Sequence, residues 1–242
     1  MGKLKLLVAA LVGLAVLVVG GTWVYINVIR EDAPERLTLQ DDPTTSASAA
    51  ASPAGSASAP AGSAAPAASG PTRWTATDGS IVGYRVDEIL NGQNVTAVGR
   101  TSDVTGEVAL DGAKVTEASF TADLTTVKSD SSRRDGQFRG RIMDTDTHPT
   151  ATFKLTQPID LGTPPADGKV VSAKATGDLT LRGTTKSVVI DLQAKRSGNA
   201  AEISGSIPIV FEDFKIPNPS FGPAQTEDNG ELEVLLKLAP AA

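Results

Sequence analysis

The chain has 242 residues, of which 40% are apolar and 21% are charged, a composition typical of a protein that folds around an apolar core. It contains no cysteine and a single histidine, His148, which excludes disulfide bonds and thiolate metal sites and argues against histidine-based catalysis. The net charge is −6 without a strongly basic block, so we expect no binding to nucleic acid. The common nucleophile, metalloprotease and phosphate-loop motifs are missing. We therefore predict a protein that is not an enzyme and that holds no metal or cofactor.

A long uncharged stretch begins close to the N-terminus. Residues 6–29 form a run of 24 residues without a charge, preceded by Lys3 and Lys5. As a helix, this run is about 36 Å long and can cross a hydrocarbon core of about 30 Å. A cleaved signal peptide has a shorter apolar region followed by small residues at the cleavage site, which this sequence lacks. We therefore predict a cytoplasmic N-terminus at residues 1–5, a single-pass transmembrane helix at 6–29 in the plasma membrane, and an extracytoplasmic chain from Arg30 onward.

A segment of low complexity follows. Of the 29 residues from 43 to 71, 27 are Ala, Ser, Pro or Gly. Such residues cannot bury enough apolar surface to offset the entropy cost of ordering the backbone, and the five prolines interrupt helices. Together with the charged stretch that precedes it, the segment predicts a disordered linker over residues 30–72. A linker of this length would hold the following domain a few nanometres from the membrane.

Residues 73–239 show the alternation of a β-domain. Apolar side chains recur at every second position, which is the pattern of antiparallel strands with one buried and one solvent-exposed face. The runs cover residues 82–86, 104–110, 120–124, 177–181, 188–194, 203–211 and 232–238. We expect about eight to ten strands in all, which must remove their edges by closing a barrel or by stacking two sheets.

Two features interrupt this pattern. Residues 131–146 lack alternation and predict one helical turn followed by a loop, in which Phe138, Ile142 and Met143 recur near helical spacing and form a candidate plug or gate. Glycines also fall within or beside the apolar runs, at Gly83, Gly106, Gly177 and Gly205. A glycine in a strand marks a bend or a place where another group approaches the backbone closely, and a barrel needs such corners.

Three motifs in the β-domain carry a resemblance to a known family. They are RRDGQFRGRIMDTDTHPTATF at 133–153, GDLTLRGTTKSVVIDL at 177–192 and FEDFKI at 211–216. In content and order they resemble the YceI-like family of polyisoprenoid-binding proteins. The matching positions include Arg134, Asp135, Pro149, Gly177, Thr180, Gly183 and Lys186, with His148 where the family usually has an aromatic residue. The resemblance implies an antiparallel, lipocalin-like β-barrel with a short helical segment and a late strand at Asp213-Phe214.

The resemblance also implies an elongated apolar cavity that holds a polyisoprenoid chain or a prenylated quinone. Together with the alternation and the candidate plug, it makes these residues candidates for lining the lumen: Val82, Tyr84, Val108, Phe120, Ala122, Leu124, Phe138, Ile142, Met143, Phe153, Leu179, Ile190, Leu192, Ile207 and Val234. The predicted function is that of a membrane-tethered, extracytoplasmic lipid-binding module.

A second hypothesis stays open at this point. A fully packed barrel could instead recognise another envelope protein or a glycan through its rim. The interior volume distinguishes the two, because a lipid carrier needs a cavity of roughly 300 Å³ or more. The oligomeric state is left open by the sequence.

Overall fold

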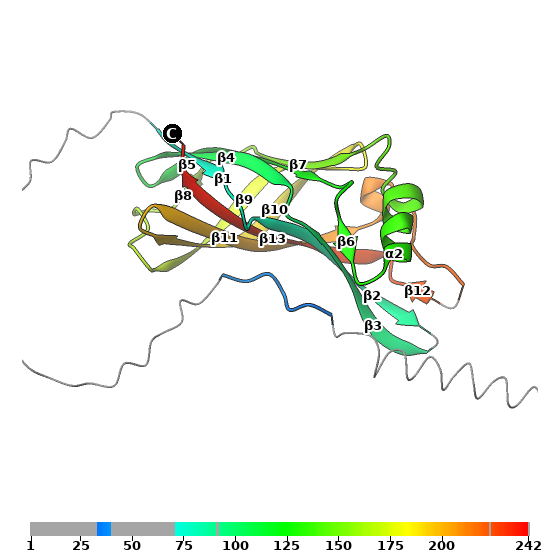
Figure 1. Cartoon of the computed structure of the whole chain (residues 1–242). Helices are drawn as coiled ribbons and strands as arrows, with labels where there is room; N and C mark the ends of the chain where they lie inside the picture. The colour runs from blue at the N-terminus through cyan, green and yellow to red at the C-terminus, as the bar shows by residue number, and fades with distance from the viewer. Residues whose placement is uncertain (1–32, 40–70, 91, 223, 242) are drawn as a thin grey trace, which may run out of the picture.

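The computed structural model describes residues 33–39, 71–90, 92–222 and 224–241. Most of these residues form one β-barrel with a short helical segment at one end (Figure 1). The predicted transmembrane helix at 6–29 and most of the predicted linker lie outside the described residues. Within the described part of the chain, no helix is long and apolar enough to cross a membrane.

The described residues form thirteen strands and three short helical elements. The strands are β1 (Thr72–Ala76), β2 (Ile81–Leu90), β3 (Gln93–Thr101), β4 (Val104–Asp111), β5 (Lys114–Asp123), β6 (Lys128–Ser129), β7 (Thr150–Leu155), β8 (Ile159–Asp160), β9 (Val170–Leu181), β10 (Thr184–Ser197), β11 (Ala200–Val210), β12 (Ala224–Thr226) and β13 (Asn229–Pro240). The helical elements are the α-helix α2 (Ser132–Gln137), the π-helix η2 (Phe138–Ile142) and the 3-10 helix η3 (Glu212–Phe214).

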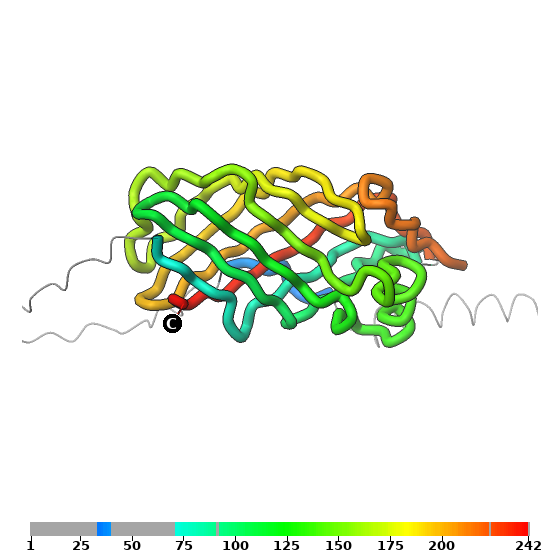
Figure 2. The backbone as a smooth tube through the Cα atoms, turned by 90° about the horizontal axis from the view of Figure 1, so that it is seen from above, coloured from blue at the N-terminus to red at the C-terminus, as the bar shows by residue number. Residues whose placement is uncertain are grey.

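Eight strands close the barrel in the order β1-β4-β5-β7-β9-β10-β11-β13, and β13 returns to β1. Each pairing in this ring is antiparallel. The strands run obliquely along the barrel (Figure 2). β1 pairs with the last residues of β13, and β2 pairs with the residues of β13 that precede them. The β2–β3 hairpin therefore extends the sheet past the ring at the end where α2 lies (Figure 1). The prediction of an all-β antiparallel barrel with a short helical segment is confirmed.

The interior is apolar along the length of the barrel. One cluster of buried side chains surrounds Phe138 and Ile209 at the end that carries α2. A second cluster surrounds Trp74, Val108 and Leu238 toward the other end. The strands alternate as expected because successive side chains of a strand point to opposite faces of the sheet.

Glycines of the inner wall let aromatic rings of neighbouring strands lie against the backbone. A Cβ atom at each of these glycines would overlap a ring, and the pairs are Gly99 with Tyr84, Gly106 with Phe120, and Gly177 with Phe153. The prediction that strand glycines mark close approaches is therefore confirmed at Gly106 and Gly177. The approaching groups are the barrel's own side chains.

The helical segment is longer than the single turn that the sequence predicts. The Ser131 side chain caps α2 by accepting a hydrogen bond from the Arg134 N–H, and α2 runs directly into η2. In η2 the Met143 N–H donates to the Phe138 carbonyl at 2.8 Å, a five-residue spacing that inserts one extra residue into the helix. Two glycines, Gly136 and Gly140, lower the helix propensity here, which is why the pattern indicated a loop.

The prediction of a late strand at Asp213-Phe214 is wrong. β11 ends at Val210, and the next residues form η3, which Lys215 terminates in a left-handed conformation with φ of 53°. Phe211 and Phe214 are buried although neither lies in a strand. Phe211 continues the alternation of apolar residues in β11, so the sequence pattern extends beyond the residue at which the strand ends.

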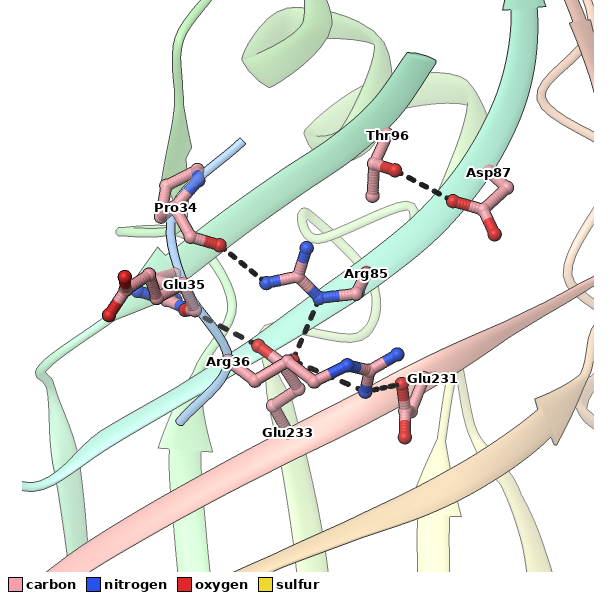
Figure 3. Close-up of polar contacts among 9 residues, drawn as sticks. Pro34, Glu35, Arg36, Arg85, Asp87, Thr96, Glu231 and Glu233 are labelled. Atoms are coloured by element: carbon pink, nitrogen blue, oxygen red, sulfur yellow. Dashed lines mark hydrogen bonds and ion pairs between the residues drawn. The ribbon is translucent and has the colours of Figure 1, made fainter. Parts of the chain in front are cut away.

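Part of the predicted linker lies on the barrel. Residues 33–39, which we call the strap, run in an extended conformation across the outer wall of the barrel (Figures 1 and 3). The Pro34 carbonyl accepts a hydrogen bond from Arg85 at 2.6 Å, and Arg36 pairs with Glu231. The composition of the linker indicated disorder, but the charged residues of this part have partners on the barrel. The other residues of the predicted linker lie outside the described residues, apart from Pro71 and Thr72, and Thr72 already belongs to β1.

Candidate binding cavity

A cavity of about 410 Å³ lies inside the barrel at the end that carries α2 and β12. Its walls are mostly apolar and come from β2, the helical segment, the residues on either side of η3 and the strands opposite. The lining side chains include Tyr84, Val86, Phe138, Phe211, Ile216 and Leu232. This volume is in the range of sites that hold small ligands.

A second cavity of about 120 Å³ lies deeper in the barrel. It is lined by apolar residues of the ring strands, among them Val108, Leu179 and Ile207. Val82, Ala151 and Leu232 line both cavities, so the two spaces adjoin. An elongated apolar molecule that occupied both spaces would lie along the barrel.

All fifteen lumen candidates line one of these cavities. The larger cavity is lined by Val82, Tyr84, Leu124, Phe138, Ile142 and Met143. The smaller one is lined by Val82, Val108, Phe120, Ala122, Phe153, Leu179, Ile190, Leu192, Ile207 and Val234. Their contact with a ligand stays a prediction.

Tyr84 and Phe138 form an aromatic wall of the larger cavity. Their rings stack with centroids 5.1 Å apart and an angle of 15° between the planes. Burial raises the pKa of Tyr84 above its ordinary value of 10.0, so its hydroxyl stays neutral even in alkaline solution. The contact joins β2 to η2, and it fixes the helical segment against the inner wall beside Ile142 and Met143. The candidate plug is therefore part of the wall of the cavity.

The rim of the larger cavity is polar. Arg134 lines it and pairs with Glu88 at 3.0 Å and with Asp130. Burial lowers the pKa of Arg134, but the charges of Asp130 and Glu88 outweigh this effect and the pKa is raised. Arg133 also lines the cavity and lies over the ring of Phe221, 5.7 Å from its centroid. An apolar space with a polar rim suits an amphipathic ligand whose head group stays near the rim.

The residues of the first two family motifs hold the rim and its turns in place. Asp135 is buried and accepts hydrogen bonds from the Ser129 N–H at 2.8 Å and its hydroxyl at 2.6 Å. The Pro149 carbonyl accepts a hydrogen bond from the Leu124 N–H at 2.8 Å. These residues therefore join the helical segment and β7 to the rest of the barrel.

The remaining motif residues form the β9–β10 turn and its surroundings. Gly183 has φ of +69°, and the His148 ring occupies the space that a Cβ at Gly183 would need. The hydroxyls of Thr180 and Thr185 are 2.8 Å apart. Lys186 pairs with Asp213 at 3.3 Å, which links this turn to η3. Gly177 lies under the Phe153 ring, as described above. The residues that match the family motifs therefore mainly stabilise the turns and contacts at this end of the barrel.

Sequence reasoning missed several residues of the larger cavity. Phe211 and Leu232 belong to the alternating runs and could have been found from that signal. Ile216 and Phe221 follow η3, in a segment without alternation. Ile216 is the last residue of the third family motif, whereas no sequence signal pointed to Phe221.

Comparison with known proteins places the barrel in a family. A family model for the YceI-like domain matches residues 75–238, from β1 to β13. The chain belongs to the YceI-like family. The match includes residues of all eight strands of the closed ring together with the helical segment, so the resemblance noted in the sequence is confirmed for the family.

Individual proteins of similar sequence or fold were also found. A UPF0312 protein of Vibrio parahaemolyticus is 30% identical over 128 residues, and one of Vibrio cholerae is 32% identical over 127 residues. Each match covers 49% of this chain and 64% of the relative, so the chain spans less than two thirds of these relatives. Among solved structures, a polyisoprenoid-binding domain of Saccharophagus degradans implicated in plant cell wall breakdown has a TM-score of 0.58 at 17% identity. That match covers 70% of this chain and 98% of the other, and it shows a shared fold.

Proposed function

We propose that this YceI-like protein is a lipid-binding module that holds a polyisoprenoid chain or a prenylated quinone inside its barrel. The observation that carries the proposal is the pair of adjoining apolar cavities, of about 410 and about 120 Å³, with a polar rim at one end. A packed barrel that acts only through its rim would not need this interior space. The volume therefore favours the lipid hypothesis over the envelope protein or glycan hypothesis.

The energetics of apolar burial support the same ligand class. Each buried methylene contributes about 0.8 kcal/mol, so a five-carbon isoprene unit contributes about 4 kcal/mol before other costs. Ordering of the chain and loss of its translational freedom offset part of this gain. Because the cavity walls are mostly apolar, affinity would depend on the length of the prenyl chain that fits inside.

The related domain of Saccharophagus degradans, which is described as polyisoprenoid-binding, supports the same type of ligand for this chain. The shared barrel and the family assignment make the interior the natural place for it.

We also propose that residues 6–29 anchor the protein in the plasma membrane as a single-pass helix, with the barrel outside the cytoplasm. The support is the 24-residue uncharged run and the two lysines that precede it. An anchored barrel would stay close to the membrane in which prenyl lipids reside.

Ala151 offers a direct test, because it is buried and lines both cavities. In Ala151→Phe the added ring would fill the junction between them. We expect full-length Ala151→Phe purified from its host to lose most of the prenyl lipid that solvent extraction and mass spectrometry recover from the unmodified protein. Its melting temperature should change little, because filling a cavity costs less than overpacking a solid core, at about 1–3 kcal/mol.

Lys154→Phe is the matched control, since Lys154 lies on the same strand, β7, but is exposed on the outer face. This variant should retain the lipid. Absence of prenyl lipid from the unmodified protein, or equal lipid content in both variants, would contradict the proposal.

A further inference from the structure

The strap is attached to the barrel by a cluster of charged groups around Glu233. The Glu233 carboxylate accepts a hydrogen bond from Arg85 at 2.8 Å and lies 3.3 Å from Arg100 and 3.7 Å from Arg36. Arg36 also pairs with Glu231 beside it (Figure 3). Although Glu233 points outward from β13, only 2% of it is exposed.

The sequence of β2 makes this cluster possible. Arg100 lies on β3, directly opposite Gly83 of β2, while Glu233 lies opposite Gly83 on its other side, on β13. A Cβ at Gly83 would come within 2.7 Å of the Arg100 side chain. The missing side chain therefore lets Arg100 cross β2 and reach Glu233. Arg100 also donates a hydrogen bond to the Glu35 carbonyl, so the same arginine holds the strap.

The strap has a defined direction on the barrel. Its first residues lie on β2, where Arg85 binds the Pro34 carbonyl. Leu37 and Thr38 line a groove with Ser172, near the start of β9. Because β2 runs toward its hairpin with β3 at the end that carries α2, the strap begins on the side of the cavity rim and runs away from it (Figure 1).

This attachment shortens the connection between the proposed anchor and the barrel. From Ile29, the last residue of the proposed anchor, to Pro34 there are five residues, which span at most about 18 Å. The part of β2 from Arg85 to Leu90 is about 17 Å long. The rim of the cavity can therefore reach the membrane surface, and the barrel cannot move several nanometres away while the strap is attached.

The surface at this end has the composition of a membrane contact. Phe221 is 57% exposed and Ile89 is 42% exposed. Arg133 and Arg141 are exposed beside them, and among the described residues neither pairs with a carboxylate. Arg141 instead donates to the carbonyls of Asn218 and Pro219. Aromatic and aliphatic side chains next to arginines suit the interface of a bilayer with anionic head groups.

We propose that the strap holds the barrel with its cavity rim against the membrane, where Phe221 and Ile89 enter the interface and Arg133 and Arg141 contact anionic head groups. The proposal rests on the membrane anchor proposed above. It assigns the α2 end of the barrel as a docking surface for an anionic bilayer. Prenyl lipid would then pass between the bilayer and the cavity without crossing water.

The chain contains no cysteine, so single-cysteine variants can carry a fluorophore at chosen positions. Phe221→Cys and Ile89→Cys report on the rim, and Val170→Cys, which is 53% exposed at the start of β9, reports on the other end. Full-length protein is placed in vesicles of phosphatidylethanolamine and phosphatidylglycerol that contain a lipid with a quencher on its head group. We expect several-fold stronger quenching at 221 and 89 than at 170. Equal quenching at all three positions, or equal rim quenching in vesicles of neutral phosphatidylcholine, would overturn the proposal.

A strap variant tests the cause of this orientation. Arg36→Glu places a like charge beside Glu231 and Glu233 and should release the strap, so that rim quenching falls to the value at 170. Arg73→Glu is the matched control, because Arg73 is an exposed arginine of β1 that pairs with other carboxylates, and rim quenching should not change. Unchanged quenching in Arg36→Glu would overturn the role of the strap.

Solvent extraction of the Ile89→Cys and Val170→Cys samples, in which the cavity lining is unchanged, separates this proposal from the proposed function. Prenyl lipid without selective rim quenching would contradict only the docking proposal. Selective rim quenching without prenyl lipid would contradict only the ligand proposal.

Discussion

The carboxylate of Glu233 lies between two arginines of neighbouring strands and beneath the strap, and 2% of its side chain is exposed. Alternation along β13 predicts an exposed residue at this position, because Glu233 points away from the lumen. The sequence could not reveal its burial, since Arg36 lies 197 positions earlier, in a segment whose composition resembles a linker (233 − 36 = 197). The alternation of side chains along a strand predicts the face of the sheet on which a residue lies, but it does not predict which other segment covers that face.

Removal of this charge should destabilise the fold. In Glu233→Gln, Arg85 and Arg100 would keep their charges without the carboxylate that neutralises them. Breaking a buried ion pair in this way costs about 3–5 kcal/mol, and partial exposure of the arginines places the expected loss near the lower value. Thermal melting of the full-length protein in detergent measures the effect. Glu231→Gln removes a more exposed carboxylate and should cost about 1 kcal/mol or less; equal losses in the two variants would contradict this account.

At the scale of elements, the helical segment and the strap are the two parts whose structure the sequence described least well. The strands were predictable because a strand places alternate side chains on one face, and this property placed the strand-borne lumen candidates on the inner wall. The α2–η2 segment contains Gly136 and Gly140, which weaken its helical pattern, and its order depends on contacts such as the Tyr84–Phe138 stack. These are tertiary contacts, and the helix propensities of the local residues do not predict them.

The strap should detach in acid. Burial raises the pKa of Glu231, but hydrogen bonds from Arg36 and Ser206 and the nearby arginine charges outweigh burial, so the pKa is lowered from its ordinary 4.5. A lowered folded-state pKa means that this attachment is fully present above about pH 4.5 and is lost as the pH falls through the lower folded value. A spin label at Thr38→Cys should therefore become more mobile below pH 4.5. With Glu231→Gln added, this group no longer titrates, and label mobility should already be raised at neutral pH; a transition identical in both proteins would contradict the assignment to Glu231.

At the scale of the whole molecule, the closed ring of strands encloses an apolar space with a polar rim at one end. The strap lies on the outer wall of the barrel. The barrel and its inner wall could be predicted from the alternation and from the family motifs. The volume of the interior could not be predicted, because the pattern of inward side chains is the same for a packed barrel and for a hollow one. The difference lies in the sizes of the inward side chains, such as the small Ala151 and Ala175 among the residues that line the smaller cavity.

The central claim is that a prenyl chain lies inside the barrel, and photo-crosslinking tests it most directly. A polyprenyl probe that carries a diazirine near the end of its chain is bound to the full-length protein, irradiated, and mapped by mass spectrometry of the peptides. The account predicts labels on cavity residues such as Tyr84, Phe138 and Phe153. In Ala151→Phe most of the labelling should be lost, and above all the labels beyond the junction, such as Phe153. Labels confined to outward-facing residues such as Val189 and Val210, which are 56% and 50% exposed, would contradict it.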